Sequence, residues 1–199
     1  MTKRWMLTTV ALGACTLAGC SALKMSRVSD DWEQVDRQRV KRLVVVTAPF
    51  AAGDEKVAEM WSTLAARYVD LKRNFIIKDK AVSAAASPDL AALCTEGVEG
   101  VLWLRPGLQL EGRGAEAQVQ GRLLRCVDQQ EVWAADAAGS WVSAEPKLEQ
   151  TIAQYVDEYG PSVQPYVAPS YYVLQAALDS LPEPELTEDD QSEKIENAQ

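Results

Sequence analysis

Two strand-like segments flank a short turn in the middle of the chain, and this pattern constrains the fold more than any other. The segments span residues 98–106 and 115–126, and the turn spans residues 111–114, with the sequence EGRG. A glycine-containing turn between two such segments predicts an antiparallel β-hairpin. This pairing would bring the residues just before the first strand close to the end of the second strand. Cys94 and Cys126 occupy those two places.

The rest of the sequence predicts further strands and helices. The predicted strands are 42–50, 74–80, 98–106, 115–126 and 131–139, and the predicted helices are 54–73, 87–94, 145–160 and 169–181. The order is therefore β-α-β-α-β-β-β-α-α. The first two strands, joined through a helix, are expected to be parallel neighbours, and the last three to form an antiparallel meander. We predict a single α/β (α+β) domain with a mixed five-stranded sheet and helices packed on it.

Apolar periodicity indicates which side chains form the core. Residues 42–50 are rich in β-branched side chains, which is typical of a buried strand. The helix after this strand carries one apolar stripe at helical spacing, formed by Val57, Met60, Trp61, Leu64 and Tyr68. We expect this stripe, together with Trp103 and Trp133 in the strands, to be core.

The N-terminus has the pattern of an export signal. Lys3 and Arg4 precede an uncharged run over residues 5–17, which is too short to span a bilayer comfortably. A basic start, a short apolar segment and small residues before a cleavage point are typical of a signal peptide that is removed. We predict that residues 1–19 are this signal peptide.

Leu17-Ala18-Gly19-Cys20 resembles the lipobox of bacterial lipoproteins. The resemblance implies that the Cys20 thiol receives a diacylglyceryl group, that the chain is cut before Cys20, and that the new amino terminus is acylated. Cys15 is a poorer candidate because its apolar segment would be shorter, and a simple secretory signal is the other alternative. Ser21, where an aspartate typically retains a lipoprotein at the inner membrane, implies sorting to the outer membrane, facing the periplasm.

Composition narrows the function further. The chain has a formal net charge of −9, and an acidic surface is a poor partner for nucleic acid. It has no histidine, which excludes Ser-His-Asp catalysis and histidine-based zinc sites. Carboxylate chemistry, for example with Glu96 and Glu99 around Gly97, stays open as a minor alternative. We expect a protein that is not an enzyme and uses no cofactor or metal.

Export also bears on Cys94 and Cys126. A disulfide persists in an oxidising compartment, and the predicted hairpin brings the two cysteines together. Closing a loop of this length would stabilise the fold by about 3–4 kcal/mol in the chain-entropy model. We predict this disulfide, with two unpaired core thiols as the alternative.

The ends of the chain are polar. Residues 20–41 are expected to be the lipidated cysteine and a tether, residues 42–181 the globular domain, and residues 182–199 an acidic, flexible tail in which Thr187 could cap a short helix. Residues 30–42 mix charges and predict a short helix. Its cations Arg37, Arg39, Lys41 and Arg42 would either bind a membrane surface or form a solvated connection to the first strand.

From the lipobox through KRLVVVTAPF, GVEGVLWLRP and LLRC to the tail, the chain resembles an uncharacterised family of bacterial outer-membrane lipoproteins, known mainly from myxobacteria and leptospires. The order of elements more loosely resembles penicillin-binding-protein activator lipoproteins, the N-terminal domain of TolB and the curli secretion lipoprotein. The resemblance implies a lipid-anchored envelope protein that docks onto or regulates another envelope protein. The alternative is a subunit of a secretion or transport assembly.

Three aromatic residues are weak pointers to a partner surface. Trp141 follows the last predicted strand, and Tyr171 and Tyr172 open the last predicted helix. Aromatic side chains are enriched at binding hot spots, although each of these is more readily explained by packing. The sequence does not define the partner-binding residues.

Overall fold

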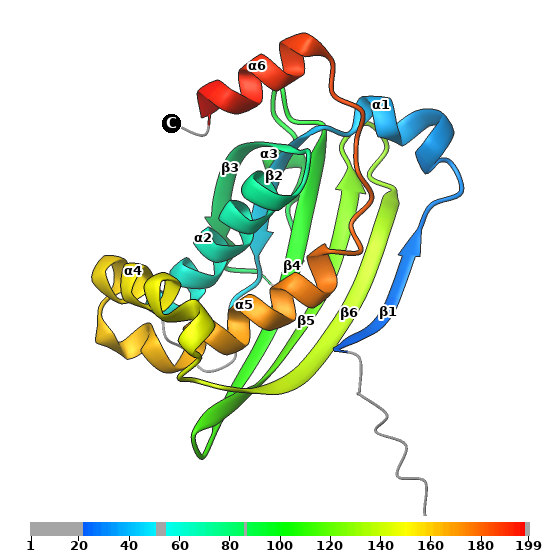
Figure 1. Ribbon diagram of the computed structural model, residues 1–199. Coiled ribbons are helices and arrows are strands. Elements are labelled where there is room, and N and C mark those ends of the chain that lie inside the picture. The colour runs from blue at the N-terminus through cyan, green and yellow to red at the C-terminus, as the bar shows by residue number, and fades with distance from the viewer. Residues whose placement is uncertain (1–21, 51–54, 86, 198–199) are drawn as a thin grey trace, which may run out of the picture.

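The computed structural model of the 199-residue chain describes residues 22–50, 55–85 and 87–197. A mixed sheet of six strands, in the order β1-β6-β5-β4-β2-β3, runs through these residues (Figure 1). The strands are β1 Leu23–Val28, β2 Arg42–Thr47, β3 Ile76–Val82, β4 Gly100–Glu111, β5 Gly114–Arg125 and β6 Glu131–Val142. The predicted class, a mixed sheet with helices packed on it, is confirmed, and the sheet has one strand more than predicted.

Helices α2 and α5 cover one face of the sheet, and α4 packs against both of them (Figure 1). The helices are α1 Arg37–Arg39, α2 Glu55–Lys72, α3 Leu90–Leu93, α4 Glu149–Tyr159, α5 Gln164–Leu178 and α6 Glu188–Asn197. Shorter helical turns are η1 Trp32–Asp36, η2 Pro146–Leu148 and η3 Pro161–Val163.

The sheet has a parallel half and an antiparallel half, as predicted. β2 lies between β3 and β4 and is parallel to both, and α2 forms the crossover from β2 to β3. β4, β5 and β6 form a meander of three strands with twelve residues each. At about 3.4 Å per residue, this meander is about 40 Å long.

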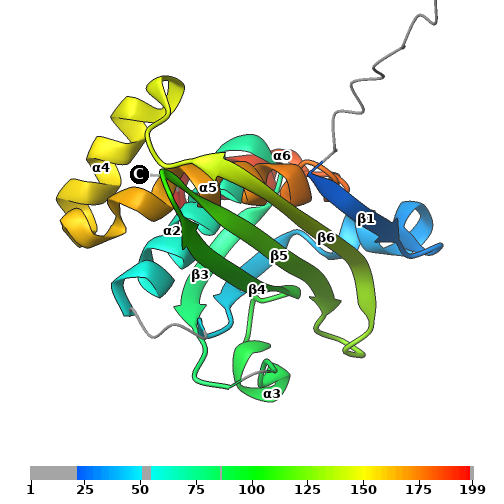
Figure 2. The ribbon, with the colours of Figure 1, turned by 90° about the horizontal axis from the view of Figure 1, so that it is seen from below.

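Toward the β4–β5 turn, the meander buries only one of its faces. Along β5, Ala115, Ala117 and Val119 are buried, whereas the intervening Glu116 and Gln118 are exposed. This alternation is that of an antiparallel strand with one face on the core and one in water. Helices α2 and α5 lie on the buried side, and α3 lies on the other side near β4 (Figure 2).

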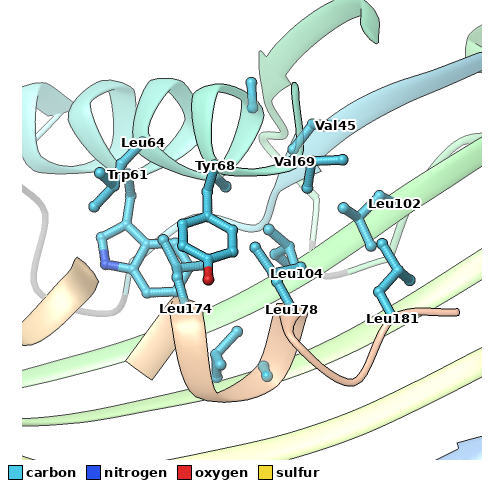
Figure 3. Packing of buried hydrophobic residues seen from close by; sticks show 14 of the residues in the cluster. Val45, Trp61, Leu64, Tyr68, Val69, Leu102, Leu104, Leu174, Leu178 and Leu181 are labelled. Carbon is cyan, nitrogen blue, oxygen red and sulfur yellow. The ribbon is translucent and has the colours of Figure 1, made fainter. Parts of the chain in front are cut away.

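Large apolar side chains fill the space between the sheet and the two long helices. Trp61, Leu64, Tyr68 and Val69 of α2 meet Leu174 and Leu178 of α5 above Leu102 and Leu104 of β4 (Figure 3). The stripe predicted on α2 is buried throughout, and so are Trp103 and Trp133, with 4% and 1% exposure. The prediction of these core residues is confirmed.

Residues 23–28 form the edge strand β1, although the sequence predicted a tether there. β1 pairs antiparallel with β6, with Leu23 opposite Ala137 and Val28 opposite Trp133. An edge strand is held by backbone hydrogen bonds to one neighbour, so it needs little apolar surface. Most of its side chains are exposed, and hydrophobic periodicity therefore cannot reveal it.

The connection from β1 to β2 is likewise part of the domain. The predicted short helix is present as η1 and α1 and is only partly solvated: Arg37 and Arg39 are exposed, whereas Trp32, Asp36 and Val40 are at most 2% exposed. Lys41 is 7% exposed, and its ammonium group donates to Asp190 at 2.7 Å. Lys41 is thus engaged within the protein.

The C-terminal segment was predicted to be a flexible tail, and the structure contains helix α6 there, capped as anticipated by Thr187. The Asp190 backbone N–H donates to the Thr187 hydroxyl at 3.3 Å. Asp190 accepts from Lys41 and Arg42, each at 2.7 Å, and Glu193 accepts from Lys78 at 2.9 Å. The helix is therefore docked mainly by ion pairs. A segment with so many charged residues is predicted to be disordered when its composition alone is considered.

Helix α5 begins five residues earlier than predicted and contains Pro169 in its interior. A proline lacks the N–H that would bond the carbonyl four residues earlier, here that of Pro165. The Ser143 hydroxyl donates to this carbonyl at 2.8 Å and replaces the missing helical hydrogen bond. Pro169 is therefore tolerated within the helix.

Candidate functional site

The predicted lipidation site, Cys20, lies outside the described residues, as does Ser21. The described chain starts at Ala22, whose carbonyl accepts from the Ala138 backbone N–H of β6 at 2.9 Å.

An open depression of about 560 Å³ lies beside this edge. Polar side chains on the uncovered face of the meander line much of it, including Gln109, Glu116, Gln118 and Ser140. The Gln118 side chain lies over Gly107, and a Cβ atom there would come within 2.6 Å of the Gln118 amide nitrogen, so this side chain would have to move. The depression is polar and open to solvent.

The β4–β5 turn and the end of β6 form the hairpin tip, which we define as residues 110–114 and Val142. Leu110 is 47% exposed and Val142 is 53% exposed. Leu110 continues the row of Leu108 on the helix side, while Val142 follows the inward-facing Trp141 and therefore points to the other side. The hairpin tip thus exposes one aliphatic side chain on each face.

The structure contains the predicted bridge at the opposite end of the meander. Cys94 and Cys126 form a disulfide with a Cα–Cα distance of 5.5 Å. The pairing follows from the hairpin register, in which Gly100 lies opposite Arg125, and the Cys126 N–H donates to the Glu99 carbonyl at 2.9 Å. Both cysteines pack on a small second core on the far face of β2 and β4, formed by Val44, Val46, Ala48, Val101 and Trp103.

The disulfide leads into the β5–β6 turn, which we call the distal turn, residues 126–130. Arg125 holds this turn through an ion pair with Asp128 and a second one with the fully buried Asp36. Hydrogen bonds from Arg125 lower the pKa of Asp128 below its usual value. At the crest of this rigid turn, Val127 is 83% exposed.

The two ends of the meander therefore differ in kind. The distal turn is fixed by a covalent bond and two ion pairs and lies beside a depression of about 580 Å³ that Val35, Val98 and Arg39 help to line. The hairpin tip lies at the other end of the same strands (Figure 1). A protein bound at one end would not contact the other end directly.

Glu96 and Glu99, the carboxylates considered for hydrolytic chemistry, have different surroundings. Both oxygens of Glu99 accept hydrogen bonds from the start of β2: the Lys41 N–H at 2.8 Å, the Arg42 N–H at 3.0 Å and the Arg42 guanidinium at 3.1 Å. Glu96 is exposed. Glu99 thus anchors the first residues of the central strand.

The aromatic residues noted in the sequence pack on one another. Trp141 stacks on Tyr172 with ring centroids 6.3 Å apart, and Tyr171 meets Tyr68 edge-on at 5.8 Å. All three noted residues are partly buried. They join the base of the hairpin tip to the middle of α5 and to α2.

Within the described ranges, no group of three or more Cys, Asp or Glu side chains is arranged to hold a metal ion. Among the same residues, none of the helices combines the length and apolar character needed to cross a bilayer. The sequence pattern predicted the disulfide pair. It did not single out the hairpin tip or the distal turn as candidate surfaces, because the exposure of their aliphatic side chains is defined only by the fold.

Several solved structures align with this chain at low similarity. The PelC dodecamer from Paraburkholderia phytofirmans aligns with a TM-score of 0.45 at 11% identity, over 77% of this chain and 96% of that one. Lipoprotein GNA1162 from Neisseria meningitidis aligns with a TM-score of 0.35 at 14% identity, over 59% and 96%. TolB from Acinetobacter baumannii aligns with a TM-score of 0.26 at 12% identity, over 70% of this chain and 31% of its own length.

These likenesses are distant and concern the fold alone. No family model and no curated protein matches the chain. Function is therefore argued from the residues of this chain.

Proposed function

We propose that this chain is a non-enzymatic lipoprotein of the cell envelope, held by acyl chains on Cys20 at the outer membrane and facing the periplasm. The observation that carries the proposal is the short connection between the lipobox and the sheet. Only Ser21 separates Cys20 from Ala22, whose carbonyl is bonded to β6. Acylation of Cys20 would hold the folded domain directly on the membrane.

Three acyl chains would make this attachment permanent. A single myristoyl chain binds a membrane reversibly, and each buried methylene adds about 0.8 kcal/mol. Sorting to the outer membrane rests on Ser21. The change Ser21→Asp is expected to move the protein inward where the usual retention rule operates, as density-gradient fractionation would measure. Recovery of the unaltered protein chiefly from the inner membrane would contradict the sorting proposal.

The role we propose for the domain is to dock onto another envelope protein through the distal turn. Val127 is an exposed aliphatic side chain on a turn that the Cys94–Cys126 disulfide and the ion pairs of Arg125 already hold rigid. A rigid turn loses little conformational entropy on binding, and this favours affinity. The charged Arg39 and Asp128 beside it would form a polar rim.

The test begins with a photo-crosslinking residue placed at Val127 in cells and identification of the captured protein by mass spectrometry. Binding of that purified protein is then measured with the parent chain, Val127→Asp and Leu71→Asp. Leu71 is the matched control, a 74% exposed aliphatic residue on α2. We expect Val127→Asp to weaken binding at least tenfold and Leu71→Asp to leave it unchanged. Equal effects of the two substitutions would contradict docking through the distal turn.

A further inference from the structure

We infer that the hairpin tip enters the lipid headgroup layer of the membrane that carries the anchor. This inference rests on the proposed lipidation of Cys20 and adds which surface of the domain meets the bilayer. The partner is a phospholipid headgroup surface. Three features of the molecule support it: the reach of the tether, the overhang of the meander and the chemistry of the tip.

The tether is very short. Only Ser21 separates Cys20 from Ala22, and an extended chain spans at most about 3.6 Å per residue, so two residue steps keep the Cys20 backbone within about 7 Å of Ala22. The Ala22 carbonyl is fixed by its hydrogen bond to the Ala138 N–H. The anchored membrane surface would therefore pass near this point on the sheet edge, at the reach of these two residue steps plus the glyceryl linker on the cysteine.

The meander extends farther than the tether. From Ala138, β6 continues four residues to Val142, which is about 13 Å along the strand, and the β4–β5 turn lies at the same end. In Figure 1 this turn projects beyond the start of β1. If the strands stand upright on the membrane with this end down, the tip lies about 6 Å beyond the acylated residue, which is the difference between about 13 Å of strand and about 7 Å of tether. The headgroup layer on one side of a bilayer is about 5 to 7 Å thick.

The tip has the chemistry that this layer accommodates. Leu110 and Val142 are 47% and 53% exposed and lie on opposite faces of the sheet, so each can contact the upper acyl region. Arg113 and Glu111 in the turn are exposed and can stay among the headgroups. The Trp141–Tyr172 stack lies just behind the tip, and aromatic rings of this kind are enriched at membrane interfaces.

Two other surfaces lie within reach of the tether and fit lipid less well. The uncovered face of the meander presents Glu116 and Gln118, which have no affinity for hydrocarbon. The β1 edge exposes Met25 and Val28 less than the tip exposes its aliphatic residues, with 36% and 41% exposure. This edge is the competing orientation, and the experiment separates it from the tip.

The experiment measures how closely each surface approaches lipid. The full-length lipidated protein is reconstituted into vesicles of phosphatidylethanolamine and phosphatidylglycerol, with or without bromine near the head of the acyl chains. Leu110→Trp reports on the hairpin tip, Met25→Trp on the β1 edge, and Val127→Trp is the matched control at the distal turn. The fluorescence added by each tryptophan is compared between the two kinds of vesicle.

We expect bromolipid to quench the tryptophan of Leu110→Trp several-fold more than those of Met25→Trp and Val127→Trp. Vesicle flotation is measured on the same samples. Protein that floats while quenching is equal at all positions, or is greatest for Met25→Trp, overturns the tip inference and leaves the anchor intact. Protein that does not float overturns the anchor, and with it this inference.

Discussion

The Lys41 ammonium group lies 2.7 Å from the Asp190 carboxylate, and both side chains are less than a tenth exposed. This pair joins the segment before β2 to helix α6, two regions that the sequence had placed outside the domain. Arg42 and Thr187 also bond Asp190, so this carboxylate is the buried anchor at the start of α6, while Glu193 and Lys194 add contacts farther along the helix.

Replacing this carboxylate should release the C-terminal helix. Asp190→Asn keeps the shape of the side chain but removes the charge that compensates Lys41, and the loss of charged hydrogen bonds should cost about 2–3 kcal/mol. We expect faster amide exchange over residues 188–197 by mass spectrometry, because α6 can detach while the core stays folded. Asp189→Asn is the matched control, an exposed neighbour with the same change of charge. Equal exchange in both variants would contradict the docking role of Asp190.

Acid should release α6 as well. Burial raises the pKa of Asp190, but hydrogen bonds from Lys41 and Thr187 outweigh it and hold the pKa well below its usual range. A hydrogen bond from Arg42 lowers the pKa of Glu193 in the same way. Because both values are depressed in the folded state, their stabilisation is present above the ordinary carboxyl range and is lost as the pH falls below about 4.

Circular dichroism with amide exchange between pH 7 and pH 3 would follow this loss. We expect the exchange of residues 188–197 to rise at a higher pH than that of β5. Exchange in the two segments that rises together would show that α6 is not an independently docked element.

Removing the disulfide should destabilise the distal turn first. Cys94→Ser combined with Cys126→Ser opens a loop whose closure is worth about 3–4 kcal/mol in the chain-entropy model. Urea unfolding of the parent and the double variant would give the difference. Peptide mapping of periplasmically expressed parent protein without reductant is the control for the bridge itself. Recovery of both thiols free would contradict the hairpin register as well as the disulfide.

The Ser143 hydroxyl compensates for Pro169 within α5, and its removal should be measurable. Ser143→Ala leaves the Pro165 carbonyl without this donor and should lower the free energy of unfolding by about 1 kcal/mol. Ser140→Ala, an exposed serine on β6, is the control and should change stability far less. If the two substitutions have the same effect, the hydrogen bond to Pro165 contributes nothing.

The parts of the fold that sequence predicted are those in which apolar side chains repeat at a regular period. The α2 stripe around Trp61 and the alternation along β5 are of this kind, and the hairpin register followed from the turn at Gly112 together with Cys94 and Cys126. Strand β1 was not predicted because an edge strand is held by backbone hydrogen bonds, which leave no apolar pattern in the sequence. The docking of helix α6 was not predicted because its basic partners, Lys41, Arg42 and Lys78, lie more than one hundred residues earlier in the chain.

The candidate surfaces were harder to anticipate than the fold. Val127 and Leu110 are ordinary aliphatic residues in the sequence, and only their exposure at opposite ends of one rigid meander distinguishes them. The lipobox at Cys20 is a local motif and is read without any knowledge of the fold. The proposed anchor therefore rests on the sequence, and the proposed orientation of the domain on it rests on the register of β1 on β6.

The mass of the N-terminal peptide tests the central claim most directly. The chain would be expressed in a bacterium that processes lipoproteins, purified from membranes and compared with Cys20→Ser. We predict a peptide that begins at Cys20 and carries a thioether-linked diacylglyceryl group and an amide-linked acyl chain, while Cys20→Ser is uncleaved or soluble. A mature peptide without acyl groups, or a Cys20→Ser chain found in membranes with the same modification, would contradict the lipid anchor.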